Sequence, residues 1–300
     1  MELKNKMNMD RSGISTILIA VIVIVVIAVA AAAAYVFLTG NDEGDKEVIA
    51  PGTVLEYDQL VNGEYNATLK AEYKGQNADE YFVKISYGNV YEYGMEPKGM
   101  PDGAKKTGTA QLDTILGNKT VDVWEYTEDG IAVKAYADQS NPVLAYKQEW
   151  TQSGYSVELV LSSFEPVWQT SYEESEDIGT EYTYIISYGG YSYDRKMVCI
   201  ADCLDGKYGV SYDVSNFRDG IEVQYYLSNY PEGLPSDAIK VGNMTTIVLL
   251  NGENQQVEKW TMSVPGKITS SFYCDPVTHI VYRAVFDETG APIVFDLQVD

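Results

Sequence analysis

The chain begins with a long apolar run and then changes to alternating polar and apolar positions. Residues 14–38 carry no charged side chain, and this run of 25 residues is apolar on every face of a helix. Such a helix would be about 37 Å long, which exceeds the ~30 Å hydrocarbon thickness of a bilayer and allows for some tilt. The pattern therefore predicts a transmembrane helix at residues 14–38.

Beyond this run, short segments rich in Val, Ile, Thr and Tyr are separated by Gly, Asn and Asp. Period-two alternation of this kind is typical of strands in half-exposed sheets. In the first half, strands are predicted at residues 65–73, 81–87, 120–126, 131–136, 143–150 and 155–161. The predicted fold class is mainly β, with a single N-terminal transmembrane helix followed by two tandem related antiparallel β domains.

An internal repeat supports the count of two domains. Residues 97–108 align without gaps to residues 231–242, with six identical positions. The alignment continues in order to the C-terminus, where an alternating apolar triplet at residues 157–161 matches one at residues 293–297. Its structural anchors include Pro101 and Pro235, Gly108 and Gly242, and Trp124 and Trp260. This order predicts a tandem duplication of a unit of about 110 to 120 residues, which is a typical domain length.

The predicted organisation follows from these two patterns. It consists of a basic cytoplasmic leader (residues 1–13), the transmembrane helix (14–38), a flexible stalk (39–51), a first β repeat domain (52–164), an acidic linker (165–178) and a second β repeat domain (179–300). The stalk is polar and acidic, so we expect it to pack against little. Whether the two repeats are separate domains or share one sheet stays open.

Charge asymmetry around the apolar run predicts the orientation of the chain. Lys4, Lys6 and Arg11 precede the run, whereas the residues that follow it closely are acidic. The positive-inside rule places the N-terminus in the cytoplasm and the remainder outside. The expected location is the cell membrane, with a single pass and an extracytoplasmic C-terminal domain.

The residues just before the apolar run carry a recognisable motif. Arg11-Ser12-Gly13-Ile14-Ser15-Thr16 resembles the class III signal of archaeal type IV pilin-like proteins. The resemblance implies cleavage between Gly13 and Ile14, with the helix kept on the mature protein. The chain is also similar to a wider group of archaeal surface proteins with acidic, β-rich ectodomains, which implies a location. An uncleaved anchor and a secretory signal peptide, cut within residues 28–34, are the alternatives.

Composition narrows the classes of partner. The chain has 44 acidic and 21 basic residues, and a net charge of −23 repels nucleic acid. It also has 25 tyrosines, of which Tyr91 and Tyr93, Tyr182 and Tyr184, and Tyr191 and Tyr193 form pairs spaced by two. Each pair would project from one face of a strand, as an aromatic ladder or as a recognition platform for a surface protein or glycan.

Three glycosylation sequons would lie outside the membrane. They begin at Asn66, Asn118 and Asn243. Only Asn118 lies in a clear turn signal, which is where a surface sequon is best placed.

Catalytic and metal chemistry have few candidate residues. His279 is the single histidine, and it is expected in a surface turn, so no Ser/His/Asp set can be assembled. The three cysteines are Cys199, Cys203 and Cys274, which lack the paired spacing of a zinc site. Cys199 and Cys203 would be about 13 Å apart in a strand, so a disulfide would need Cys274. We expect no catalytic residue, no cofactor and no metal site.

The leading functional hypothesis is a non-enzymatic, membrane-anchored surface protein whose duplicated, acidic, Tyr-rich β domain binds a partner or contributes to the envelope. The first alternative is a pilin-like filament subunit processed between Gly13 and Ile14. The second is a lipid or lipoprotein carrier, in which a curved sheet would enclose an apolar cavity.

Overall fold

The computed structural model describes residues 48–128, 130–216, 220–263, 269–286 and 292–299. Apart from one 3-10 turn at Leu204–Gly206, their regular structure consists of antiparallel strands, which confirms the prediction of a mainly β protein. No helix in this part of the chain is long and apolar enough to cross a membrane. The predicted helix at residues 14–38 and the predicted processing site at Gly13 and Ile14 lie outside the described residues.

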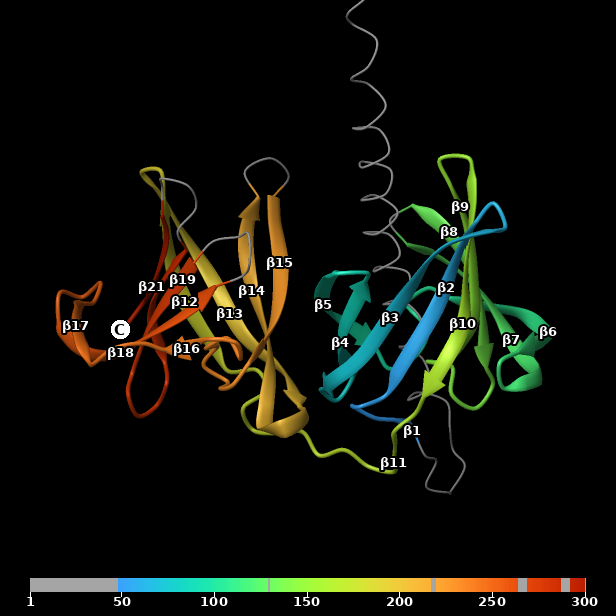
Figure 1. The fold of residues 1–300 in the computed structure, drawn as a ribbon, viewed down its shortest axis with the longest axis horizontal. Coiled ribbons are helices and arrows are strands. Elements are labelled where there is room, and N and C mark those ends of the chain that lie inside the picture. The colour runs from blue at the N-terminus through green and yellow to red at the C-terminus, as the bar shows by residue number, and fades with distance from the viewer. Residues whose placement is uncertain (1–47, 129, 217–219, 264–268, 287–291, 300) are drawn as a thin grey trace, which may run out of the picture. The chain divides into compact units, whose positions relative to one another are not determined.

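The chain divides into two compact units (Figure 1). The first unit consists of Met1–Tyr73 and Asp79–Thr170, and the second of Lys74–Ala78 and Ser171–Asp300. The short segment Lys74–Ala78 is therefore grouped with the second unit, although it lies within the range 52–164 that the repeat predicts for the first domain.

The described residues of the first half of the chain form eleven strands. They are β1 (Val48–Ile49), β2 (Val54–Val61), β3 (Glu64–Gln76), β4 (Glu80–Tyr87), β5 (Val90–Pro97), β6 (Lys105–Thr114), β7 (Gly117–Glu128), β8 (Ile131–Asp138), β9 (Ala145–Gln152), β10 (Tyr155–Glu165) and β11 (Trp168–Gln169). Antiparallel pairing runs in the order β6, β7, β8, β9, β10, β2, β3, and β4 pairs with β5 as a hairpin. The six strands predicted in this half are all present, although β9 begins two residues later than expected.

The second half forms ten strands among its described residues. They are β12 (Glu181–Tyr188), β13 (Tyr191–Cys203), β14 (Lys207–Asn216), β15 (Gly220–Ser228), β16 (Ile239–Lys240), β17 (Thr245–Val248), β18 (Asn254–Ser263), β19 (Thr269–Cys274), β20 (Val281–Phe286) and β21 (Ile293–Leu297). Pairing runs in the order β15, β14, β13, β12, β21, β20, β19, β18, and β18 also pairs with β16 and β17. The order β13, β12, β21, β20, β19, β18 corresponds strand by strand to the order β3, β2, β10, β9, β8, β7 of the first unit.

Strand registers also correspond between the units. Trp124 on β7 lies opposite Lys106 on β6, and Trp260 on β18 lies opposite Lys240 on β16. The carboxylate two residues before each tryptophan forms an ion pair with that lysine, Asp122 with Lys106 at 2.6 Å and Glu258 with Lys240. Corresponding side chains therefore make corresponding contacts on corresponding strands.

A second correspondence lies in the turns after β8 and β19. Tyr146 donates a hydrogen bond to Asp138 at 2.7 Å, and Tyr282 donates one to Asp275 at 3.4 Å. In both carboxylates the other oxygen accepts two backbone N–H groups from the residues that follow. A carboxylate that closes a turn in this way is an Asx-type motif, so the two repeats build this turn by the same local chemistry.

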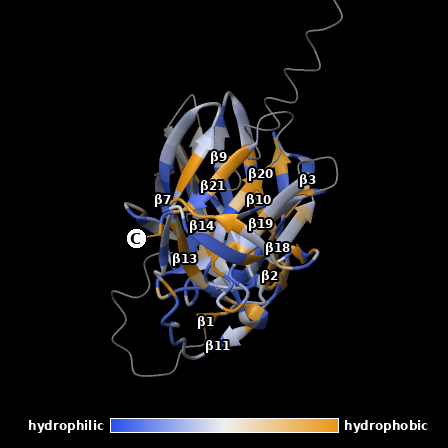
Figure 2. Ribbon diagram, turned by 90° about the vertical axis from the view of Figure 1, so that its left-hand side faces the viewer, coloured by the Kyte–Doolittle hydropathy of each residue, from blue (hydrophilic) through white to orange (hydrophobic). Residues whose placement is uncertain are grey.

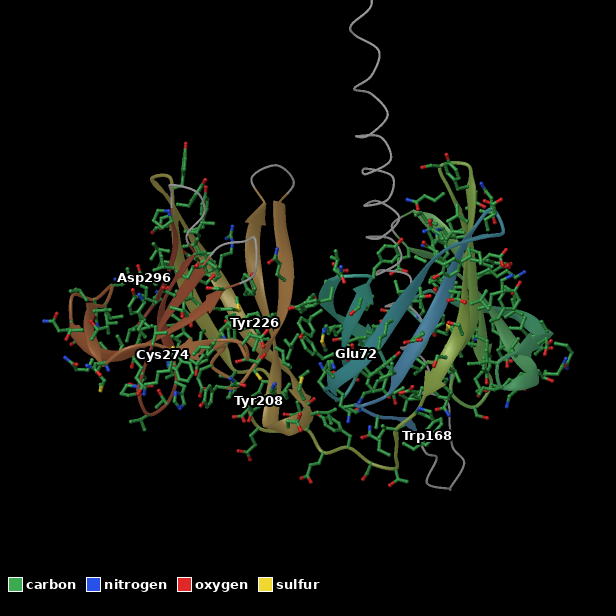
Figure 3. The ribbon with its side chains drawn as sticks, viewed as in Figure 1. Glu72, Trp168, Tyr208, Tyr226, Cys274 and Asp296 are labelled. Carbon is green, nitrogen blue, oxygen red and sulfur yellow. The ribbon has the colours of Figure 1, made fainter. Side chains whose placement is uncertain are left out.

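The described end of the predicted stalk, residues 48–51, contacts the first unit, whereas we expected the stalk to pack against little; residues 39–47 of the stalk lie outside the described residues. Ile49 is 1% exposed and pairs through β1 with Trp168 of β11. Trp168, labelled in Figure 3, also makes an edge contact with Phe164 at a centroid distance of 6.1 Å. An isoleucine and an indole ring supply apolar surface that a free stalk would leave in water.

The predicted acidic linker, residues 165–178, is likewise bonded to its surroundings. The Tyr172 hydroxyl donates to Asp202 at 2.6 Å, and the Tyr208 hydroxyl donates to Asp177 at 2.9 Å. These bonds hold residues 171–178 within the second unit, so this part of the linker is not a free spacer.

Apolar side chains gather on one face of each sheet. Along β10 the buried residues are Val157, Leu159 and Leu161, which alternate with more exposed positions. Figure 2 shows hydrophobic and hydrophilic residues mixed along the strands in this way. In the second unit Tyr226, labelled in Figure 3, donates to the Gly233 carbonyl at 2.6 Å, so its buried hydroxyl has a partner.

Candidate functional site: a buried carboxyl in the first unit

A glutamate lies in the packed core of the first unit. Glu96, near the end of β5, is opposite Tyr81 of β4 and is only 1% exposed. Tyr81 is equally buried, and residues directly opposite in a ladder share one face of the sheet. A buried carboxyl is costly unless its oxygens are hydrogen-bonded or it stays protonated, so its surroundings determine its chemistry.

The two oxygens of Glu96 have different surroundings. The Tyr73 hydroxyl donates to Oε2 at 3.1 Å, whereas Oε1 is buried and has no hydrogen-bond partner. The nearby Tyr57 and Tyr126 are also buried, and the Tyr126 hydroxyl has no partner either. We call Glu96, Tyr57, Tyr73 and Tyr126 the Glu96 centre. These four residues lie on β5, β2, β3 and β7.

The electrostatics of the Glu96 centre are dominated by burial. Burial raises the pKa of Glu96 to about 8, against a smaller lowering by the hydrogen bond from Tyr73, and the negative charge of Glu128 raises it further. Burial also raises the pKa of Tyr57, Tyr73 and Tyr126 above the usual value for a phenol. The three phenols therefore stay neutral at physiological pH and act as hydrogen-bonding groups.

Three further side chains with an unpartnered atom lie on β9. Gln148 Oε1, Trp150 Nε1 and Gln152 Oε1 are buried without a hydrogen-bond partner. Trp150 lies opposite Val133 of β8, and Val133 lies opposite Tyr126 of β7. Tyr126 and Trp150 therefore belong to one cross-strand row of the same face, in the same packed core as Tyr57 and Tyr73.

The second unit replaces these polar groups. At the positions of the second unit that align with these polar residues, no side chain is a carboxyl or a carboxamide. The pairs are Glu96 with Tyr230, Tyr126 with Met262, Gln148 with Ala284, and Trp150 with Phe286. Because the same strand order forms with these residues, the unpartnered polar groups of the first unit are not a requirement of the fold.

The unpartnered atoms differ in the hydrogen bonds that they can make. Glu96 Oε1 and Gln148 Oε1 are acceptors, Trp150 Nε1 is a donor, and the Tyr126 hydroxyl can serve as either. Buried polar atoms nearly always have partners, so each unpartnered one needs an explanation such as a water, an ion or a ligand.

Comparisons with known proteins give no family. No family model matches the sequence, and no curated protein matches it. One similar solved structure is the MucA/MucB complex of Pseudomonas aeruginosa, with 9% identity and a TM-score of 0.27, covering 82% of this chain and 88% of that one. Another is kievitone hydratase from Nectria haematococca, with 9% identity and a TM-score of 0.20, covering 89% of this chain and 95% of that one. Scores this low carry no argument about fold or function.

The structure places the single histidine differently from expectation. His279 does lie at a turn, with a positive φ of 61°, but it is half-buried and stacks on Tyr230 at a centroid distance of 4.0 Å. Its Nδ1 is buried without a hydrogen-bond partner. The described residues contain no group of three side chains suited to hold a metal ion.

All three cysteines are free thiols. Cys199 and Cys274 are buried and Cys203 is half-buried, so none of them forms the disulfide that the sequence left open. Burial raises the pKa of Cys199 and of Cys274 to about 12, and it also raises that of Cys203.

The tyrosine pairs and sequons are placed as follows. Tyr91 and Tyr93 make an edge contact at 5.7 Å, and Tyr93 stacks on Phe82 at 5.2 Å, so this pair forms an aromatic ladder. Tyr184 is buried and donates to the Val281 carbonyl at 2.8 Å. The three sequon asparagines are all exposed: Asn66, Asn118 and Asn243.

The sequence analysis did not single out Glu96, Gln148 or Trp150 as site residues. The available signal was the repeat itself, because aligned positions that are polar in one copy and apolar in the other mark groups that the fold does not need.

Proposed function

We propose that this protein is a non-enzymatic, membrane-anchored binding protein outside the cell, built from two tandem related β domains of which the first holds a ligand. The anchor is the apolar run at residues 14–38, and the basic leader keeps the N-terminus in the cytoplasm. The net charge of −23 argues against nucleic acid as a partner.

Matched contacts in the two units support the duplication. Gly52 N donates to the Tyr73 carbonyl at 2.7 Å, and Gly179 N donates to the Cys199 carbonyl at 2.8 Å, so both repeats begin with the same bond. Their final strands also agree, since Leu161 lies opposite Tyr57 as Leu297 lies opposite Tyr184.

The unpartnered polar atoms of the Glu96 centre and of β9 carry the proposal of binding. Each buried unpartnered group costs about 1 to 3 kcal/mol of stability, and removing such groups should be favourable in evolution unless they serve a purpose. The second unit has Met262 and Ala284 at the positions of Tyr126 and Gln148, so apolar residues fit there. Retention in the first unit is best explained by a ligand that completes the bonds.

Each unit also exposes tyrosines in strands next to hairpin turns. Tyr65 and Tyr91 of the first unit and Tyr191 of the second are 52% to 65% exposed. Exposed tyrosines provide rigid contact area with a polar end, which suits a surface protein or a glycan. We assign the interior to a small ligand and these strand ends to a macromolecular partner.

The test of binding removes two of the unpartnered polar atoms with little change of shape. Tyr126→Phe and Gln148→Met, combined in the full chain, should leave unfolding stability unchanged or higher, because no hydrogen bond is lost. Small molecules released from the purified wild-type protein by denaturation, and detected by mass spectrometry, should be absent from this variant.

The second unit provides the matched control. Tyr184→Phe removes a hydroxyl that does have a partner, the Val281 carbonyl, so it should lower stability by about 1 kcal/mol and leave the released molecules unchanged. Strong destabilisation by Tyr126→Phe with Gln148→Met would show that these groups are structural, and would overturn the proposal.

A further inference from the structure

We propose that β17 (Thr245–Val248) is the contact strand of a two-fold symmetric dimer, in which it pairs antiparallel with β17 of a second copy of this chain. The proposal concerns the second unit and is independent of the ligand proposed for the first. It follows from apolar side chains on both faces of the strand, from an edge that lacks the usual protection, and from side chains that match under two-fold symmetry.

Apolar residues occupy both faces of β17 and of the positions next to it. On one face Ile247 and Leu249 are buried in a small apolar cluster with a valine of β18. On the other, Met244, Val248 and, in the following turn, Leu250 are 49% to 53% exposed. Apolar residues on both faces are typical of a strand that is covered on both sides. The outward residues of β17 are therefore suited to contact with another molecule.

The backbone edge of β17 is open. The strand pairs with β18, and in the part of the chain that the structure describes it has no second partner strand. Figure 1 shows it at a rim of the second unit. The Leu249 N–H donates to the Glu253 carbonyl at 2.9 Å. Because the bonding direction alternates along an antiparallel strand, the backbone groups of Thr246 and Val248 point to the open side. The Val248 carbonyl accepts a bond from Arg283 at 3.2 Å, and its oxygen has a second lone pair for another donor.

This edge also lacks the features that usually prevent strand pairing between molecules. Natural proteins protect an exposed edge strand with lysine, proline or a bulge. Residues 243–250 contain no charged residue and no proline, and the register of β17 with β18 runs without a shift. An apolar edge of this kind is a site for pairing with another strand.

The corresponding strand of the first unit, β6, has this protection. It begins with two lysines, and its pairing with β7 shifts at a bulge just after Lys106. Asp113 takes the place of Val248, because they lie opposite Asn118 and Asn254, which precede the two repeat tryptophans by the same distance. The fold therefore forms with a charged, polar edge and does not require the apolar outward residues of β17.

The side chains of β17 match those of a second copy. A two-fold axis through Thr246, perpendicular to the sheet, places Thr246 opposite its own copy and Met244 opposite Val248 in both directions. Directly opposite residues of an antiparallel pair share one face, so the two apolar side chains cover each other twice. The net charge of −23 opposes association of copies elsewhere, whereas residues 243–250 bring no like charges together.

A bilayer fits this surface less well than a second copy. Attraction to anionic lipid needs basic side chains at the surface, and residues 243–250 have none. Arg283, which reaches the Val248 carbonyl, is already bonded to Asp296. The negative net charge of the chain would also be repelled by anionic lipid.

Disulfide crosslinking in membranes tests the contact on the full-length protein. Two differently tagged copies are co-expressed and oxidised mildly. Thr246→Cys places two thiols at the two-fold axis, where the Cα atoms of a hydrogen-bonded pair are about 5.5 Å apart, within reach of a disulfide. Gln111→Cys is the matched control, because Gln111 is exposed on β6 and lies opposite Thr120 as Thr246 lies opposite Gln256. Thr246→Cys should give several-fold more product that contains both tags.

A charge variant provides an independent measurement. Val248→Lys alters a half-exposed side chain and adds a charge to the pairing face, so thermal unfolding should change little. The dissociation constant of the dimer, measured by sedimentation in detergent, should rise about tenfold. Thr109→Lys adds the same charge to an exposed position of β6 and should leave the dissociation constant unchanged.

Each outcome supports or overturns the proposal. Equal crosslinking by Thr246→Cys and Gln111→Cys would overturn the β17 contact. A Thr246→Cys product that joins one tagged copy to a different protein would overturn the second copy and assign this strand to that protein. A monomer at every concentration, or a dimer that Val248→Lys leaves intact, would also overturn the proposal.

Discussion

The Tyr73 hydroxyl lies 3.1 Å from one oxygen of Glu96 and binds that oxygen only, so the carboxyl is half satisfied. A single neutral donor stabilises the ionised form less than burial destabilises it, and the pKa of Glu96 is raised to about 8. The protonated carboxyl is therefore the main form of Glu96 at neutral pH.

Stability of the first unit should fall as the pH rises from about 4.5 to 8. In this window the folded protein holds a proton on Glu96 that the unfolded chain has lost, so the free energy of unfolding decreases with pH. The stabilising contribution of Glu96 is complete below its pKa in the unfolded chain and is lost above its pKa in the folded protein. The change in the free energy of unfolding is on the order of a few kcal/mol. Urea unfolding at several pH values, followed by tryptophan fluorescence, measures the slope.

Glu96→Gln removes the titrating group and should reduce this pH slope. Glu125→Gln, which alters an exposed carboxylate, serves as the control and should keep the slope. A slope that is the same in wild type and in Glu96→Gln would contradict the assignment to Glu96.

Replacement of either repeat tryptophan by alanine should destabilise its own unit by a similar amount. Trp124 and Trp260 pack against the cores of their units but are half-buried, so the cost should be about 2 to 3 kcal/mol, below that of a fully buried indole. Denaturant unfolding of the two single variants provides the measurement. A cost under 1 kcal/mol for one of them would show that the two positions are not equivalent.

The thiols should be unreactive in the folded protein. Cys199 and Cys274 are buried, and burial raises the pKa of each to about 12, so almost no thiolate is present at pH 8. Iodoacetamide labelling, read by intact mass, should be slow in buffer and complete for three cysteines in denaturant. Rapid labelling at Cys274 without denaturant would mean that the second unit opens locally.

The first peptide of the mature protein distinguishes an anchor from a processed subunit. We expect mass spectrometry to find an intact N-terminus or a start at Ile14, because both keep the apolar run at residues 14–38. A start near Tyr35 would instead identify a removed signal peptide and contradict the membrane anchor.

If Ile14 comes first, Gly13→Asp should block processing, since it places a bulky charge where the resembled peptidase accepts a small neutral residue. The unprocessed protein should stay in the membrane. Filaments formed by this variant would rule out a pilin-like assembly that depends on cleavage.

Alternation in the sequence predicted the strands that have one buried face. The strand expected at residues 81–87 is β4 (Glu80–Tyr87), whose buried residues include Tyr81 and Val83. It did not predict β6 (Lys105–Thr114), in which no side chain is fully buried. A strand paired on one side only and exposed to water needs no apolar period, so its sequence carries little signal.

The Glu96 centre could not be predicted from local pattern. Its members come from four strands, and Tyr73 and Glu96 are 23 residues apart in the chain. Glu92 and Glu96 share one strand face with Gly94, a pattern that indicates a solvated face. Glu96 is buried only when these four strands come together in the folded unit. Their arrangement depends on pairings between segments that are distant in the chain.

The grouping of Lys74–Ala78 with the second unit has a consequence for synthesis on the ribosome. Gln76 pairs with Asp202 of β13, and a side chain at Gly75 would collide with the Asp202 backbone. Residues 74–78 leave the ribosome well before residues 171–300, which form the remainder of their unit. The first unit can therefore complete its sheet early, whereas this segment waits for partners more than a hundred residues downstream. Such distant contacts slow folding, so the second unit should be the later and slower half of the chain to mature.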